Sequence, residues 1–263
     1  MIWLNVLVTS AGRRVKIIQY LKKELESHNG KVIAVDCDKN ALALYFAHHF
    51  ELVPEIFKEN YIKELKRICY KYQINGIISL IDPELLLLSK HVHEFKNIGA
   101  NLILSDADVV AICFDKYKTY QFLKNNGLPY VPTYIDKVKV QKELEEGNIK
   151  FPLIVKPRKG SASIGIHEVK SLEEMNLLHD TYSNLIIQPK ISGKEYGIDV
   201  YLDTLTNQPV DIFIKQKIKM RAGETDKSIA VRNDNIKELI LKLVRQHYSV
   251  STNLKGFNLR SVC

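Results

Sequence analysis

A loop of small and basic residues follows a buried strand in the middle of the chain. The apolar segment 153–156 (LIVK) ends in Lys156. Small residues allow backbone N–H groups to approach phosphate oxygens closely, and lysines supply positive charge. The spacing GxxxxGK followed by Ser or Thr is absent, so this is not a P-loop, and the segment alone fits a phosphate-binding loop and a flexible hairpin equally well. The small or basic loop residues are Lys159, Gly160, Ser161, Ser163 and Gly165.

A second candidate site lies where the apolar segment 185–188 (LIIQ) leaves the core. A flat base would fit over the short connection that follows, because backbone carbonyl and N–H groups there would read an adenine edge. Glu195 begins the next alternating segment and is placed to accept hydrogen bonds from ribose hydroxyls. The residues of this expected hinge are Gln188, Pro189, Lys190 and Ile191.

The candidate residues in the first hundred positions have structural alternatives. Gly12 lies between a strand and a helix, as in half of a dinucleotide loop with Asp36 as ribose ligand. Because GxGxxG is absent, we favour a tight turn over NAD(P) binding. Asp82 and Glu84 follow a strand and would bind an amine group of a substrate. Pro83 between them favours a helix N-terminus, where the dipole stabilises acids.

The hydrophobic pattern predicts two kinds of architecture in succession. Up to about residue 105, strands alternate with helices, which predicts an α/β unit with a mainly parallel sheet covered on both faces. From residue 151 onward, extended segments separated by turns predict an antiparallel α+β unit. The expected strands are 4–9, 31–36, 76–81, 101–105, 153–156, 164–169, 185–188, 196–202 and 210–219. The expected helices are 15–25, 61–72, 115–126, 172–179 and 235–246.

Composition excludes several classes of protein. The 263 residues include 46% hydrophobic and 26% charged residues, which is ordinary for a folded soluble domain. No apolar stretch approaches the roughly 20 residues of a membrane span. The net charge of +8 is spread without a basic block, so we expect no nucleic-acid partner. The four cysteines form no CxxC pair, and the apolar segment 1–9 reads as a first strand rather than a signal peptide, so we expect a cytoplasmic protein.

Taken in order, these segments resemble the ATP-grasp superfamily, and most closely proteins similar to the large subunit of carbamoyl phosphate synthetase. The resemblance runs from about Leu4 to Asn258 and depends on six motifs in the right order. The motifs are VLVTSAGRR with VIAVDCD, Asp82-Pro83-Glu84, Asp115-Lys116, the VKP strand with its glycine loop, QPKISGKEY, and Arg221-Ala222-Gly223-Glu224-Thr225.

The resemblance implies a carboxylate- or bicarbonate-activating ligase that uses ATP and joins the acyl phosphate to an amine or ammonia. Lys116 and Lys156 would hold the ATP phosphates, the loop 161–165 would be a mobile flap over them, and Arg221 would be the catalytic residue near the γ-phosphate. Residues 1–107 would form a pre-ATP-grasp Rossmann-like domain and 108–263 the ATP-grasp domain, with a lid at roughly 130–187. The implied partners are small-molecule carboxylates and amines, with no membrane partner, and a homo-oligomer is left open.

One departure from the family pattern concerns Mg²⁺. Family members hold two Mg²⁺ ions on an Asn-x-Gln strand followed by a Glu-x-Asn-x-Arg strand. Here Arg260 stands where Gln is expected, and the sequence stops at Cys263, as after a frameshift. We therefore expect an ATP-grasp domain without its last strands or metal ligands and with weak or no turnover. The alternative is a natural nucleotide-binding remnant or regulatory module without catalysis.

Overall fold

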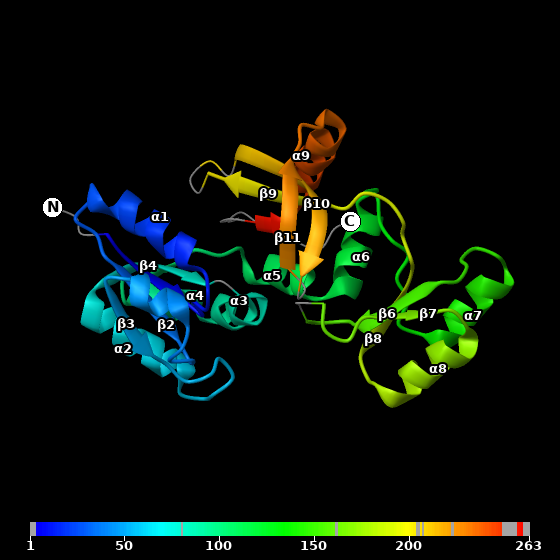
Figure 1. The fold of residues 1–263 in the computed structure, drawn as a ribbon, viewed down its shortest axis with the longest axis horizontal. Helices are drawn as coiled ribbons and strands as arrows, with labels where there is room; N and C mark the ends of the chain where they lie inside the picture. The colour runs from blue at the N-terminus through cyan, green and yellow to red at the C-terminus, as the bar shows by residue number, and fades with distance from the viewer. Residues whose placement is uncertain are drawn as a thin grey trace. The chain divides into compact units, whose positions relative to one another are not determined.

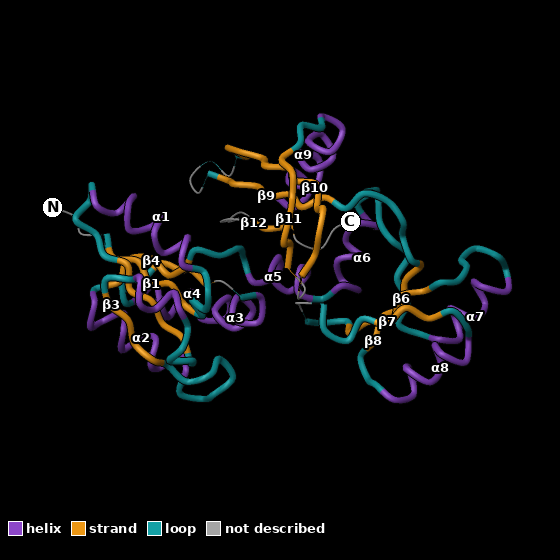
Figure 2. The backbone as a smooth tube through the Cα atoms, in the orientation of Figure 1, coloured by secondary structure: helices purple, strands orange, loops and turns teal. Residues whose placement is uncertain are grey.

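The computed structural model describes residues 4–79, 81–160, 163–203, 206, 208–221, 224–248 and 257–259. The chain divides into two compact units, Met1–Ala107 and Asp108–Cys263. Figure 1 labels most of their helices and strands, and Figure 2 shows the same backbone by secondary structure. Within the described residues, no helix combines the length and the apolar character needed to cross a membrane.

The first unit is a parallel sheet with helices on both faces, which confirms the predicted fold class. Its five strands lie in the order β3-β2-β1-β4-β5, and every neighbouring pair is parallel. The strands are β1 (Asn5–Thr9), β2 (Val32–Asp36), β3 (His49–Leu52), β4 (Ile74–Ser79) and β5 (Asn101–Leu102). The helices are α1 (Val15–Glu26), α2 (Tyr61–Tyr72), α3 (Asp82–Leu88) and α4 (Val92–Asn97), with short 3₁₀ turns at Leu42–Phe46 and Ser89–His91.

Successive side chains of each strand point to opposite faces of the sheet, so this unit has two hydrophobic cores. Leu7 and Ile33 point to one face and pack with Leu65 and Ile68 of α2. The intervening residues, among them Val8 of β1, point to the other face and pack against α1. Helical connections make the strands parallel and cover both faces of the sheet, so its central strands are near-continuous apolar runs.

The strands of the second unit are antiparallel, as the sequence predicted, and they form two sheets. A three-stranded sheet has the order β7-β6-β8, and a four-stranded sheet has the order β11-β10-β9-β12. The strands are β6 (Leu153–Pro157), β7 (His167–Val169), β8 (Leu185–Pro189), β9 (Tyr196–Leu202), β10 (Pro209–Arg221), β11 (Glu224–Ala230) and β12 (Phe257–Leu259). The helices are α5 (Ala107–Phe114), α6 (Lys116–Asn125), α7 (Lys137–Glu145), α8 (Leu172–Thr181) and α9 (Asp234–Tyr248).

Each of these sheets has its own core. Leu153 and Val155 of β6 pack with Val140 of α7 and Met175 of α8. The four-stranded sheet packs its buried side chains, such as Ile198, against α9 and against residues of α5 and α6. The smaller sheet with α7 and α8 therefore forms a packed layer of its own within the unit.

Candidate functional site

Lys156 is placed on the face of β6 opposite the core of its sheet. Side chains alternate along a strand, so the buried Leu153 and Val155 direct Lys156 to the other face, where it is half-buried. Among the described residues, none accepts a hydrogen bond from its ammonium group or forms an ion pair with it. Burial lowers the pKa of Lys156. A half-buried cation without a described partner is costly, and an anionic ligand would remove that cost.

Lys116, at the start of α6, contacts the root of the predicted phosphate loop. Its ammonium donates hydrogen bonds to the carbonyl oxygens of Pro157 (3.0 Å) and Gly160 (2.9 Å). The structure thus brings Lys116 to the loop that follows Lys156. The assignment of both lysines to phosphate binding stays a prediction.

The loop after β6 has the backbone conformations that its small residues allow. Gly165 has φ +69°, and a Cβ at this position would lie 3.1 Å from Cγ of Pro157, so only glycine fits without strain. Lys159 is exposed before the turn, and Ser163, also exposed, lies in it with φ +58°. Ser161 lies outside the described residues.

The residues of the predicted adenine hinge are partly committed to contacts within the unit. The Gln188 side-chain amide donates to Oγ1 of the buried Thr133 (2.7 Å). Lys190 donates its backbone N–H to the carbonyl of Pro152 (3.1 Å), and its ammonium pairs with Glu168 (2.6 Å). Pro189 ends β8, and Ile191 beyond it is 67% exposed.

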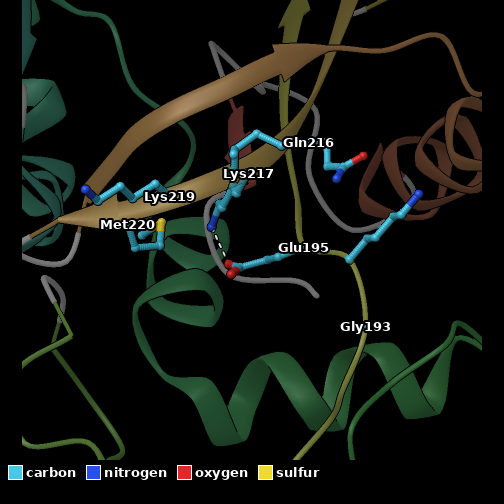
Figure 3. Close-up of a pocket in the computed structure, with 8 residues that line it drawn as sticks. Gly193, Glu195, Gln216, Lys217, Lys219 and Met220 are labelled. Atoms are coloured by element: carbon cyan, nitrogen blue, oxygen red, sulfur yellow. Dashed lines mark hydrogen bonds and ion pairs between the residues drawn. The ribbon is translucent and has the colours of Figure 1, made fainter.

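Glu195 lies in a pocket that the other predicted site residues do not line. Its carboxylate pairs with the Lys217 ammonium, and its carbonyl accepts the Lys217 backbone N–H (2.8 Å). Figure 3 shows these two side chains reaching toward each other at the pocket. Arg221 is exposed at the end of β10. The pocket has a volume of about 370 Å³ and is lined by Gly193, Lys194, Glu195, Gln216, Lys217, Ile218, Lys219 and Met220.

The two acids predicted to bind an amine both lie in the first turn of α3. Asp82 is exposed. Glu84 is fully buried, and its carboxylate accepts hydrogen bonds from the Tyr61 hydroxyl and from Oγ of Ser79 (2.8 Å). Burial and the nearby Glu84 raise the pKa of Tyr61 far above its usual range. An amine would have to compete with Tyr61 for Glu84, whereas Asp82 is accessible.

Asp36 and Gly12 hold the first turn of the parallel sheet together. The Gly12 backbone N–H donates to Oδ2 of Asp36 (2.8 Å), and the Asp38 N–H donates to Oδ1 (2.9 Å). The carboxylate that would meet a ribose in a dinucleotide site therefore has two backbone partners. These contacts are those of the tight turn that the sequence favoured.

Arg158 and Lys217 were not singled out in the sequence, and Asp115 was named only as part of the Asp115-Lys116 motif. Asp115 and Arg158 form an ion pair beside the loop, and Lys217 pairs with Glu195. The N-cap role of Asp115 was readable, because an Asp directly before a helical pattern is a favoured N-cap. The other two are distant in sequence from their partners.

The residues that the structure describes contain no group of three or more His, Cys, Asp or Glu that could hold a metal ion. Arg260, at the expected metal strand, lies outside them. The expected metal strand therefore cannot be compared with the described residues, and no step proposed below passes through a metal.

Comparison with known proteins places the chain in a family. A model of the ATP-grasp domain matches residues 113–258, more than half of the chain, and a model of the PylC-like N-terminal domain matches residues 6–103. The chain belongs to the ATP-grasp family. It is 28% identical over 172 residues to the D-alanine–D-alanine ligase of Thermotoga petrophila, an alignment that covers 61% of this chain and 55% of the relative.

Two solved structures share the fold. One is N5-carboxyaminoimidazole synthetase from Staphylococcus aureus complexed with ADP, with a TM-score of 0.70 and 19% identity, covering 93% of this chain and 64% of that one. The other is the biotin carboxylase domain of 2-oxoglutarate carboxylase from Hydrogenobacter thermophilus, with a TM-score of 0.72 and 15% identity, covering 94% of this chain and 58% of that one. The chain spans about half the length of the curated relatives it matches.

Proposed function

We propose that the chain binds ATP and acts as a ligase of the ATP-grasp type. It would activate a carboxylate or bicarbonate as an acyl phosphate, which an amine or ammonia then attacks. The observation that carries this proposal is Lys156, a half-buried cation without a described partner at the end of a strand and next to a glycine-containing loop. The family of the chain and the ADP complex of the Staphylococcus aureus relative support ATP as the ligand.

We further propose roles for the residues around Lys156. Lys156 and Lys116 would hold the phosphates, with Lys159 and the small residues of the loop closing over them. Gln188 to Ile191 would hold the adenine, and Arg221 would neutralise charge near the γ-phosphate. Glu195 would bind the ribose hydroxyls only by loosening its pair with Lys217. Phosphoryl transfer needs little covalent help, so positioning and charge neutralisation would be the contribution of these residues.

The finer family assignment and the domain roles are also proposals. The order of the VLVTSAGRR, Asp115-Lys116 and Arg221 motifs supports a carbamoyl phosphate synthetase-like ligase. Residues 1–107 would be the pre-ATP-grasp domain and 108–263 the ATP-grasp domain. The separate core that β6 and β8 form with α7 and α8 supports a lid at roughly 130–187.

The decisive experiment measures binding and turnover separately. Calorimetric titration of the chain with ATP, ADP and GTP should show adenine-nucleotide binding that GTP does not match. A coupled assay of ADP release, with panels of carboxylates and amines, then tests the ligase. Absence of ATP binding would refute the proposal as a whole. Binding without ADP release for any pair would instead favour a nucleotide-binding module without catalysis.

A further inference from the structure

The N-terminus of α6 is joined to the root of the 159–165 loop by a buried carboxylate. Asp115 is 2% exposed, and both of its carboxylate oxygens accept from Nε of Arg158, at 2.8 and 2.9 Å. Its Oδ1 also accepts the backbone N–H groups of Tyr117 (3.0 Å) and Lys118 (3.2 Å), which caps α6. One side chain therefore sets both the start of the helix and the position of Arg158.

Backbone contacts extend this connection. The Lys116 N–H donates to the carbonyl of Arg158 (3.1 Å), and Asp115 forms an antiparallel bridge with Lys159. The Lys116 ammonium completes the arrangement with its bonds to the carbonyls of Pro157 and Gly160. The start of the loop is thus held at several points to one turn of helix.

The charges of Asp115 and Arg158 balance each other at the root of the loop. Burial raises the pKa of Asp115, but the hydrogen bonds from Arg158 and from the capped N–H groups outweigh that effect and leave the pKa below its usual value. Arg158 is neutralised by this carboxylate and also lies over the Tyr117 ring, 5.3 Å from its centroid. The charge of Arg158 is therefore balanced by Asp115, and we expect an anion at the loop to contact Lys116 and Lys156.

This part-buried ion pair adds little stability over a well-packed apolar pair, because the buried Asp115 carboxylate loses its hydration. The contribution of the Asp115–Arg158 pair is instead to fix the position of the loop root relative to the start of α6. The bonds from Lys116 to two neutral carbonyls are weaker than a bond to a charged phosphate oxygen would be. A phosphate could thus draw the ammonium away from the exposed Gly160 carbonyl while Asp115 and Arg158 keep the loop root in place.

We propose that Asp115 and Arg158 are positioning residues, which hold the loop root so that Lys116 can exchange the Gly160 carbonyl for a nucleotide phosphate. This inference rests on the proposed ATP binding. It predicts that the pair matters for the phosphates of a nucleotide and not for its adenosine part. A merely structural pair would affect both equally.

The test uses the full chain and titration with ATP and with adenosine. Asp115→Asn keeps an efficient N-cap acceptor and removes only the charge. We expect Asp115→Asn and Arg158→Gln each to weaken ATP binding about tenfold, or about 1.4 kcal/mol, and to leave adenosine binding unchanged. The double variant should bind ATP no more weakly than the worse single one, because either change alone uncouples the pair. Arg158→Lys should recover part of the loss.

The exposed pair Lys137–Asp180, between α7 and α8, provides the control. Lys137→Gln and Asp180→Asn should leave ATP affinity unchanged.

Hydrogen exchange of the Lys116 amide should accelerate in Arg158→Gln, which tests the connection even if Asp115→Asn folds poorly. If the unaltered chain binds no ATP, the proposed function fails and this inference with it. If it binds ATP and the variants bind ATP equally well, or lose ATP and adenosine in parallel, only the positioning role is refuted.

Discussion

At the scale of single residues, Lys156 offers the most direct test of the nucleotide site. The side chain of Lys156 is half-buried, and burial lowers the pKa of its ammonium group. Removing the amine therefore removes an unfavourable desolvation energy from the protein without nucleotide, and it removes a charge-assisted contact from the complex with nucleotide. Lys156→Ala should weaken ATP binding about ten- to a hundredfold, or about 1.4–2.8 kcal/mol. Calorimetric titration measures this, with the exposed Lys142→Ala on α7 as control. Unchanged ATP affinity in Lys156→Ala would remove this lysine from the site.

Acid stability of the first unit depends on Glu51. Burial raises the pKa of Glu51, but hydrogen bonds from Lys71, Arg67 and Tyr72 outweigh it and bring the pKa down to about 2. A carboxylate whose pKa is lowered by folding stabilises the fold fully at a pH above its ordinary pKa of 4.5. This contribution is lost as the pH falls from 4.5 toward 2. Since Arg67 and Lys71 are half exposed, solvent screening leaves a contribution of about 1–2 kcal/mol.

Urea denaturation between pH 6 and pH 3 tests this prediction. The free energy of unfolding should fall more steeply with acid in the natural chain than in Glu51→Gln. The change in Glu64→Gln serves as comparison, because the Glu64 side chain pairs with the same Arg67 through an exposed i,i+3 contact. Parallel pH curves for Glu51→Gln and the natural chain would contradict the assignment.

Residues of the site differ in how far the sequence could predict them. The place of Lys156 near the end of a strand was predictable, because the apolar run ends on it and the small residues of the loop follow directly. Arg158 was not, because its partner Asp115 is 43 positions away and only the fold brings them together. The same holds for Lys217, whose partner Glu195 is 22 positions away in the sequence. Sequence patterns report local geometry, and these pairs are tertiary.

At the scale of elements, the turn between α1 and β2 tolerates no side chain at Gly30. A Cβ on Gly30 would lie 2.3 Å from the carbonyl oxygen of Leu4 and 3.2 Å from Cβ of Leu25. Backbone cannot yield as a flexible side chain does, so Gly30→Ala should lower the free energy of unfolding by roughly 1–3 kcal/mol or more. Gly76→Ala in β4 is the control, because its Cβ would make ordinary contacts, the nearest at 3.4 Å. Chemical denaturation would contradict this if both variants lost the same stability.

Elements with a strong hydrophobic period were predicted well. The helix Tyr61–Tyr72 and the strand Tyr196–Leu202 agree with the prediction at both ends. The segment 164–169 was predicted as a strand, but pairing begins only at His167, because the exposed loop residues before it have no partner strand. Strand β11 was missed, since its sequence ETDKSIA lacks an apolar alternation and it is paired on one side only, with β10. Pairing with a neighbour, not its own pattern, makes it a strand.

At the scale of the whole molecule, the succession of architectures was predictable and the partition of the cores was not. Alternation of strands and helices predicts a parallel sheet, and strands in sequence predict antiparallel ones, because the connections dictate the direction. The antiparallel strands then divide between two sheets, each with a core of its own. That division depends on which helix covers which face, and residue patterns alone do not contain it.

The four buried clusters predict how stability is distributed along the chain. The described residues of two clusters all lie in the first unit, at or before Leu104. The described residues of the other two clusters all lie in the second unit, at or after Val109. Leu65 is fully buried in α2, and Leu65→Ala should lower stability by about 2–5 kcal/mol through lost burial and a residual cavity. Since no described cluster spans both units, we expect that loss in the hydrogen exchange of β1 and β4 amides only.

The amides of β9 and β10 should keep their protection in Leu65→Ala. The reciprocal variant is Leu243→Ala in α9, whose side chain is 4% exposed in the core of the second unit. It should accelerate exchange in β9 and β10 and leave β1 and β4 as they were. Regions that open independently have separate opening free energies, so each variant should affect its own unit. Equal loss of protection in both units from either variant would instead mean that the two sets of cores unfold as one cooperative structure.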